Sequence, residues 1–399
     1  MVQCMSEIRP FVLNHNVALA TEAMVGDTLE SALSQINGNS GNSYITYSVA
    51  RHTKLLSLEG ISNFFEPHTD HWVTPAEINE KFTHVFLILQ DHLRLDNADL
   101  PWERATDFLM QINRPIVVFS LGANAISTSA KALACQLPSK MLEFFSVLSH
   151  GAESMGIRGD FTAEVLDRIG IRNHVVVGCP SLFEAGPFRM VRRAVYDPLA
   201  GIAATGLFSN THENIHFFLQ DEVVLLRSLF AGYPPTATDI RAIADAYPAY
   251  RACVLAARFK DRMHFFLDIN EWKSSMHANF MLAAGTRLHG AIIALNQGVP
   301  ALCTNGDQRA AEICRLANIP HFPGHCCLDY RPQELCEMAD PTKANANYSD
   351  IYSNFRKWLV GLGIASDYSE ANAPWRIRRP PRRDRLGGLE VLTSALFES

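Results

Sequence analysis

The feature that most constrains the fold of this chain is an alternation of short apolar runs with longer segments of helical periodicity. Apolar runs without internal alternation are typical of strands buried on both faces of a parallel sheet. Helical segments between such strands are typical of doubly wound α/β units. The apolar runs are 83–91, 115–124, 174–183, 252–260, 278–285 and 298–306, and the helical segments include 138–150, 162–170 and 236–250. The alternation predicts an α/β fold built on parallel sheets.

The length of 399 residues predicts two domains, because a single hydrophobic core stops growing at about 250 to 300 residues. Residues 184–203 mix Gly, Pro and basic residues without clear periodicity, as expected of a domain boundary. We therefore predict an N-terminal Rossmann-like domain over 1–195 and a second over 196–373. An arginine-rich tail follows at 374–399, and we expect it to be a solvated extension. A contact with anionic lipid or a polyanionic substrate is the alternative.

Composition excludes several classes of protein. With 48% apolar and 19% charged residues, the chain has the balance of a folded globular protein. A net charge of -6 argues against a nucleic-acid partner, since such binding needs excess Lys and Arg. The nine cysteines lack paired spacing, which predicts neither a disulfide framework nor a metal site. The chain contains no run of about 18 apolar residues, so we predict no transmembrane segment. We expect a cytoplasmic protein, with peripheral membrane association left open.

The segment 286–300, TRLHGAIIALNQGVP, predicts an anion site. Arg287 and His289 follow an apolar strand, immediately before a helix expected to open at Gly290. The first turn of a helix offers unpaired N–H groups and the positive end of the helix dipole, and ligands of open α/β sheets bind at the carboxyl ends of strands. A phosphate or carboxylate would fit there. The alternative is structural, with the arginine paired to a carboxylate and the histidine bound to backbone.

A second strand end lies in the segment 154–171. Arg158 follows a short apolar run, and Asp160 or Thr162 is expected to cap the helix that comes next. This arrangement directs Arg158 toward a strand-end crevice. The alternative is a surface ion pair with Asp160 or Asp167.

Taken together, these segments resemble the polysaccharide pyruvyl transferase family. The resemblance covers roughly residues 35–320 and rests on the order and spacing of four segments. They are NGNSGNSYITYSVAR (37–51), GIRGDFTAEVLDRIG (156–170), VVGCPSLF (176–183) and TRLHGAIIALNQGVP (286–300). In the first segment, Asn39, Gly41 and Asn42 match a Gly- and Asn-rich loop of the family. The resemblance implies a glycosyltransferase-B-like pair of Rossmann-like domains with the active site in the cleft between them.

The resemblance also implies a function. The family transfers the pyruvyl group of phosphoenolpyruvate to sugar hydroxyls as a ketal, in exopolysaccharide biosynthesis. Phosphoenolpyruvate is then a co-substrate, no cofactor is needed, and the partner is a saccharide acceptor, with a lipid-linked one left open. In this chain Arg158 and His289 would hold the donor, and a basic residue after the next strand often assists. Arg287 is a further candidate for binding the donor, from its position at the strand end. Arg309 stands where the family commonly has lysine, which keeps the charge and alters the geometry.

His289 is the expected proton donor to the methylene carbon, because histidine titrates near neutral pH and donor phosphate would favour its protonated form. Asp221, Asp307 and Glu312 are candidates for orienting or activating the acceptor hydroxyls. Two other functions remain open. One is a glycosyltransferase of the same architecture with a nucleotide-sugar donor, and the other is a non-catalytic relative that binds sugars or anions.

Overall fold

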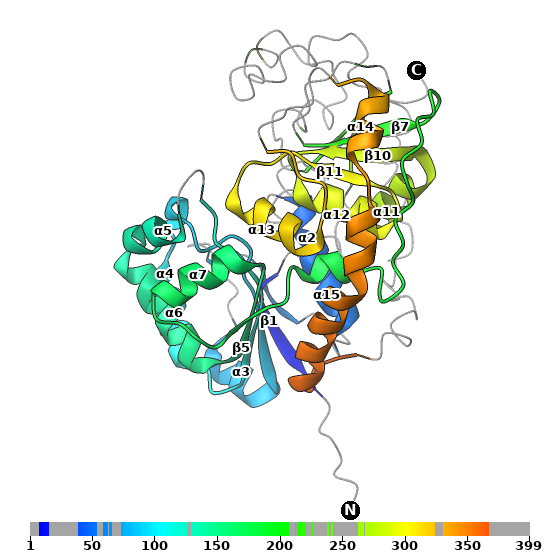
Figure 1. Ribbon diagram of the computed structural model, residues 1–399. Helices are drawn as coiled ribbons and strands as arrows, with labels where there is room; N and C mark the ends of the chain where they lie inside the picture. Colours follow the sequence, from blue (N-terminus) through cyan, green and yellow to red (C-terminus); the bar gives the residue numbers. More distant parts are fainter. Residues whose placement is uncertain are drawn as a thin grey trace, which may run out of the picture.

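The computed structural model contains two parallel sheets with helices packed around them (Figure 1). It describes residues 8–15, 39–53, 59–62, 64–65, 73–125, 129–206, 212, 214–220, 226, 238, 241, 262–266, 268–323 and 330–366. Within the two sheets, every pairing between neighbouring strands is parallel. The predicted α/β class with two Rossmann-like halves is therefore confirmed.

The first sheet has the order β2-β1-β3-β4-β5-β6 and the second the order β11-β10-β7-β8-β9. The strands of the first are β1 (Pro10–His15), β2 (Gly60–Ser62), β3 (His84–Ile88), β4 (Ile116–Leu121), β5 (Ala152–Ile157) and β6 (His174–Val176). The strands of the second are β7 (Gly201–Thr205), β8 (Ile215–Leu219), β9 (Met263–Phe265), β10 (Phe280–Gly285) and β11 (Ala301–Cys303). The direction of strand succession reverses between β1 and β3 and between β7 and β10. Ligands of such sheets bind at these switch points.

Both faces of the first sheet are covered, which explains its continuous apolar strands. Phe11 and Leu13 of β1 join a cluster with α4 and α6, whereas Val12 between them joins a cluster shared with the second sheet. The helices of the first half are α2 (Ser40–His52), α3 (Pro75–Lys81), α4 (Trp102–Met110), α5 (Ala130–Gln136), α6 (Ser139–Gly151) and α7 (Asp160–Arg168), with short 3-10 turns η1 (Leu95–Asn97) and η2 (Pro180–Phe183). Those after β9 are α11 (Ile269–Asn279), α12 (Leu288–Asn296), α13 (Gln308–Ala317), α14 (Pro332–Met338) and α15 (Thr342–Gly361).

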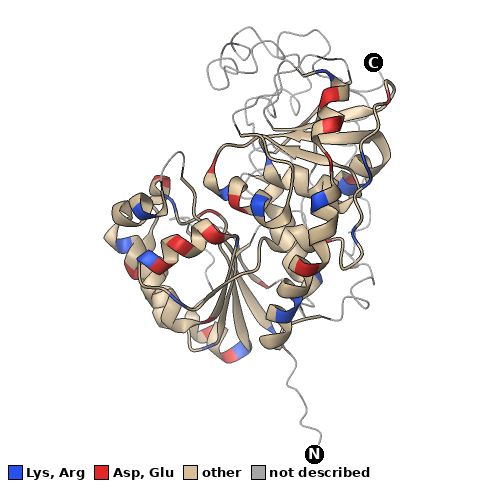
Figure 2. Cartoon of the chain, in the orientation of Figure 1, with Lys and Arg blue, Asp and Glu red and all other residues tan. Residues whose placement is uncertain are grey.

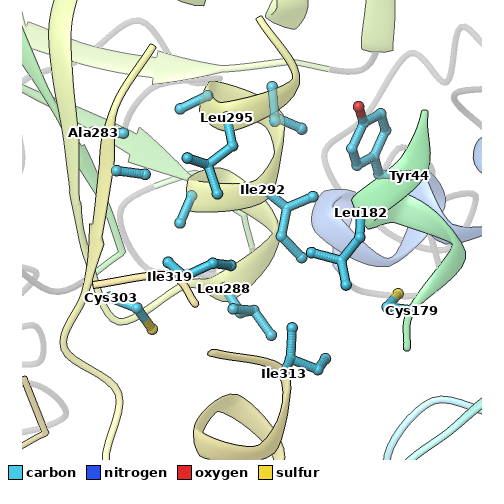
Figure 3. Close-up of a cluster of buried hydrophobic side chains, with 14 of the residues drawn as sticks. Tyr44, Cys179, Leu182, Ala283, Leu288, Ile292, Leu295, Cys303, Ile313 and Ile319 are labelled. Atoms are coloured by element: carbon cyan, nitrogen blue, oxygen red, sulfur yellow. The ribbon is translucent and has the colours of Figure 1, made fainter. Parts of the chain in front are cut away.

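The two halves share one apolar cluster. It is centred on α12, where Leu288, Ile292 and Leu295 lie near Tyr44 of α2 and Leu182 of η2 (Figure 3). Contacts of this kind hold the two sheets in one arrangement.

Helix α15 returns to the first sheet. Its Trp358 packs on Phe119 with ring centroids 5.4 Å apart, and its indole Nε1 donates to Ser154 Oγ at 2.9 Å. Gly156 makes room, because a Cβ there would lie 2.6 Å from the Trp358 ring. The predicted boundary at 195 falls in the connection between the sheets, while α15 packs against the first of them.

Most of the predicted strands that lie in the described part of the chain are present. The runs 83–91, 115–124, 278–285 and 298–306 contain β3, β4, β10 and β11. The run 174–183 is only partly a strand, because β6 ends at Val176. Gly178 then takes a positive φ of 79°, and Pro180 opens η2. The predictions for 252–260 and the tail 374–399 lie outside the described residues, and so does 236–250 apart from positions 238 and 241. Among the residues that are described, no helix is long and apolar enough to cross a membrane.

Candidate active site

Polar residues gather where the strands of the two sheets end. At the β1/β3 switch point the Asn14 side chain donates to the Ile88 carbonyl at 2.9 Å. Asn14 and Ser120, at the ends of β1 and β4, have positive φ angles of 58° and 63°. Such conformations are costly for residues other than glycine and cluster at functional sites. The backbone at the ends of β1 and β4 is therefore locally strained, and the packing of the apolar strands does not require this strain.

Arg158 is buried at the end of β5, with 1% of its surface exposed. Its Nε donates to Ser120 Oγ at 3.0 Å, and the Ser120 hydroxyl donates to Cys179 Sγ at 3.2 Å. Gly122 permits this position, since a Cβ there would lie 2.8 Å from Arg158 Cδ. Arg158 Nη2 is buried and has no hydrogen-bond partner among the described residues. A buried guanidinium with an unused donor is suited to hold an anion. The alternative of a surface ion pair is excluded by this burial.

Arg309, in the first turn of α13, reaches across to the first sheet. Its Nη1 donates to Asp91 Oδ2 at 2.9 Å, and its Nη2 donates to Asp307 Oδ2 at 3.2 Å. Burial would raise the pKa of Asp91, but Arg309, Arg158 and Arg94 outweigh it and hold that pKa well below its usual range. Asp91 therefore stays ionised and fixes Arg309 between the two halves. Figure 2 shows charged residues of both signs on α13.

His289 lies inside α12 rather than before it, which corrects the predicted helix start. The helix begins at Leu288, and the Arg287 carbonyl accepts from the Gly290 and Ala291 N–H groups at 3.1 and 3.3 Å. The buried Leu288 side chain draws the first turn onto the core, two residues earlier than expected. Arg287 becomes the N-cap, and its N–H donates to the Thr205 carbonyl of β7 at 2.9 Å. Both residues still lie at the β7/β10 switch point.

The charge state of His289 is set by its surroundings. Burial, followed by the charges of Arg158 and Arg309, lowers its pKa well below the ordinary value, although Asp91 acts in the opposite direction. Its Nε2 is buried without a hydrogen-bond partner in the described part of the chain. His289 is therefore neutral at pH 7 in the ligand-free protein, so protonation requires an additional negative charge nearby.

Glu312 caps a helix of the other half of the protein. Its Oε2 accepts from the Thr162 N–H at 2.9 Å and its Oε1 from the Thr162 hydroxyl at 2.8 Å. The prediction that Asp160 or Thr162 caps α7 is wrong. Gly159 occupies the N-cap position, and the Thr162 N–H in the first turn donates to Glu312 instead. A Cβ at Gly159 would lie 2.7 Å from the Glu312 side chain. This contact fastens α13 to α7 beside Arg158.

We expect Glu312 to make the stability of the fold depend on pH. Burial raises its pKa to about 7 despite the Thr162 hydrogen bonds, against an ordinary value of 4.5. The folded protein therefore keeps a proton that the unfolded chain releases, and this stabilisation, complete below pH 4.5, is lost as the pH rises through about 7. We expect Glu312 to contribute a fall on the order of 3 kcal/mol in the free energy of unfolding across this range. Glu312→Gln should flatten that part of the curve.

The measurement is urea unfolding of both proteins at about pH 5 and about pH 8, comparing the pH-dependent difference within each protein. Glu164→Gln, an exposed carboxylate on α7 that pairs with Arg168, is the matched control and should keep the wild-type slope. Parallel curves for wild type and Glu312→Gln would contradict the raised pKa.

The remaining predicted residues have structural partners. Asn39 caps α2, accepting from the Gly41 N–H at 2.9 Å, so Gly41 and Asn42 lie in the first helical turn rather than in the expected loop. The buried Tyr44 and Ile45 explain the early helix. This helix start meets the end of β8, where the Ser40 N–H donates to the Gln220 carbonyl at 3.3 Å.

Of the predicted acceptor carboxylates, Asp307 caps α13 in addition to its contact with Arg309. Asp221 lies outside the described residues. Sequence reasoning missed Asp91 and Ser120, although both stand at or near the ends of predicted strands. The rule that ligands meet the carboxyl ends of strands would have selected them. It could not have selected Cys179 or Thr162, which reach the site through tertiary contacts.

Comparison with known proteins identifies the family of this chain. A comparison with curated proteins found no match. A solved structure described as a putative UDP-N-acetylglucosamine 2-epimerase from Listeria monocytogenes is 11% identical, with a TM-score of 0.39, over 99% of this chain and 98% of that one. The family described as polysaccharide pyruvyl transferase matches residues 91–308. That match covers more than half of the chain and contains Arg158, Arg287 and His289, so the chain belongs to the polysaccharide pyruvyl transferase family.

Proposed function

We propose that this protein transfers the pyruvyl group of phosphoenolpyruvate to two hydroxyls of a saccharide as a ketal. The observation that carries the proposal is a set of buried nitrogens without hydrogen-bond partners among the described residues. They are Arg158 Nη2, Arg309 Nε and His289 Nε2, and they belong to both halves of the protein. Phosphoenolpyruvate has a phosphate and a carboxylate on one carbon, and such a ligand needs several donors held in fixed positions. Family membership supports the class of reaction.

The arginines divide the donor's charge between them. Arg158 is held by Ser120, and Arg309 is held by Asp91 and Asp307, so neither has to be ordered when the donor binds. Arg287 is close enough to affect the pKa of Arg309. A lysine in place of Arg309 could not contact two carboxylates through separate planar nitrogens. Compared with the family's lysine, Arg309 would hold its positive charge in a more rigid position.

The reaction consumes one donor and two hydroxyls. A proton adds to the methylene carbon, which becomes the methyl group and leaves positive charge at the neighbouring carbon and its oxygen. A sugar hydroxyl attacks that carbon, the bond to the phosphate oxygen breaks, and the second hydroxyl closes the ketal. One hydroxyl proton replaces the proton delivered to the methylene carbon and the other leaves with hydrogen phosphate. Charge and atoms balance without any oxidant or reductant.

His289 is the proposed proton donor. It is neutral in the ligand-free protein because it is buried beside Arg158 and Arg309. Donor phosphate and carboxylate would offset those positive charges and raise the pKa of His289, so the proton would be taken up together with the donor. This coupling would confine the acid form of His289 to the complex in which it is used.

The acceptor would lie where the two halves meet. Asp307 and Glu312 remain the proposed carboxylates for its hydroxyls, and Asn39, Gly41 and Asn42 the proposed contacts at the start of α2. The start of α2 lies at the end of β8, which supports an approach of the acceptor saccharide along the second sheet. Acceptor loops vary on one scaffold, so the saccharide is identified by assay rather than by fold.

The proposal is tested by donor binding and by turnover. Phosphoenolpyruvate should raise the melting temperature, while uridine and guanosine diphosphate sugars should leave it unchanged. Phosphate release from phosphoenolpyruvate should depend on added saccharide, and mass spectrometry should find a ketal on the product. Stabilisation by a nucleotide sugar but not by phosphoenolpyruvate would favour a glycosyltransferase. Donor binding without phosphate release across a broad saccharide set would favour a non-catalytic relative.

A further inference from the structure

Two cysteines and a histidine meet on the second half of the protein. Cys303 ends β11, Cys314 lies in α13, and His321 follows that helix. Their ligand atoms all lie within 4.8 Å of one another. Both thiols are buried and hydrogen-bonded to each other, and the imidazole is partly buried. The three residues are 11 and 7 positions apart in the chain, and the packing of β11, α13 and the segment after it brings them together.

The backbone holds this cluster in place. Cys303 and His321 face each other in a parallel bridge, with Cys303 N–H donating to the Pro320 carbonyl and Phe322 N–H to the Cys303 carbonyl, both at 2.9 Å. The Ile319 N–H donates to the Cys314 carbonyl at 3.0 Å, which ties the end of α13 to the same segment. The three side chains are therefore preorganised by hydrogen bonds that do not involve them.

A backbone contact fixes one ring nitrogen of His321. Its Nε2 lies 2.6 Å from the Asn305 carbonyl oxygen, which can only accept, so Nε2 carries a hydrogen and Nδ1 is the nitrogen that a neutral ring would offer as a ligand. Metal-binding histidines commonly donate their second ring nitrogen in this way, which fixes the ring and its tautomer.

We propose that Cys303, Cys314 and His321 form a binding site for a soft divalent cation, namely Zn²⁺. Sulfur and imidazole ligands select zinc over magnesium or calcium, which prefer oxygen. Three protein ligands leave one tetrahedral position for water or a further ligand. Each thiol gives up its proton on binding, so the affinity falls as the pH is lowered. This proposal departs from the expectation of no metal site, which assumed ligands close together in sequence.

The site would brace the segment that carries Arg309. Asn305, which accepts from His321, donates to the Thr286 carbonyl at 3.0 Å and accepts from the Asp307 N–H at 2.8 Å. Asp307 in turn caps α13 and contacts Arg309. A cation bound by the three ligands would link β11, α13 and the His321 segment, from which these contacts lead to Arg309. The expected role is structural and does not depend on the proposed reaction.

Metal content tests the site directly. The full chain, purified under reducing conditions without chelators, should contain about one zinc per chain when measured by inductively coupled plasma mass spectrometry. Cobalt exchanged into it should give thiolate charge-transfer bands and the intense visible bands of a tetrahedral ion. The double variant Cys303→Ser and Cys314→Ser should lose both signals. Cys336→Ser, a buried cysteine of α14 outside the cluster, should keep them.

Three results would overturn the proposal. The first is wild-type zinc no higher than in the double variant, and the second is a cobalt spectrum without thiolate bands. The third is a disulfide between Cys303 and Cys314 in the purified protein. If the double variant does not fold, His321→Ala and chelator titration of the wild type decide the question. A chelator that removes zinc without lowering the melting temperature would contradict the bracing role.

Discussion

Glutamine in place of His289 is expected to lower the saturating rate of pyruvyl transfer by roughly 10² to 10⁴-fold, while donor affinity changes much less. Glutamine keeps a neutral side chain that can donate a hydrogen bond, but it cannot deliver a proton to the methylene carbon. The measurement is the rate at saturating phosphoenolpyruvate together with donor affinity on the same folded preparation. His277→Gln, an exposed histidine in the last turn of α11, is the matched control and should retain the wild-type rate.

Proton uptake distinguishes an acid catalyst from a histidine that only packs. Because the pKa of His289 is depressed in the free protein, binding a trianionic donor should bring a proton with it. Calorimetry in buffers of different ionisation enthalpy should detect this uptake in the wild type, and the uptake should disappear in His289→Gln. A near-normal saturating rate in the variant, or a wild type that binds the donor without proton uptake, would sink the mechanism.

Arg158→Ala is expected to weaken phosphoenolpyruvate binding by roughly 30-fold to several thousand-fold, which corresponds to about 2 to 5 kcal/mol. The arginine is buried, so its loss removes a fixed cation from the site and also breaks the contact with Ser120. Donor affinity is measured by calorimetry or by quenching of tryptophan fluorescence. Arg172→Ala removes a surface arginine paired with Asp167 and should bind the donor like the wild type.

Arg158→Lys separates charge from geometry. Lysine restores the positive charge but not the planar contact with Ser120, so we expect partial recovery of donor affinity. The melting temperature of each variant shows whether the fold is kept. Wild-type donor affinity in a folded Arg158→Ala protein would remove this residue from the site.

Much of the fold can be predicted from the sequence because parallel strands are recognised locally. The runs 83–91, 115–124 and 278–285 are apolar on both faces and end in turn residues, and each contains a strand. The start of α2 could not be predicted in the same way. Its Gly and Asn residues favour a loop, and the burial of Tyr44 and Ile45 against other elements overrides that local preference.

The candidate site shows the same division. Arg158 and Arg287 could be placed from strand ends alone, because the end of a strand is visible in the sequence. The partner of Arg309 could not, because Asp91 lies 218 residues away in the chain. The cap of α7 likewise comes from Glu312, 150 residues beyond Thr162. Nothing near either residue in the sequence indicates the contact.

The sequence by itself therefore determined the α/β class, the family and the residues that end the strands, because hydrophobic periodicity and short motifs are local properties. Only the tertiary structure decided the charge state of His289, the trans-domain cap by Glu312 and the meeting of Cys303, Cys314 and His321. Each of these depends on burial and on distances between separate elements of the fold. Desolvation and charge–charge interactions act through space, so they are set when the two sheets pack together.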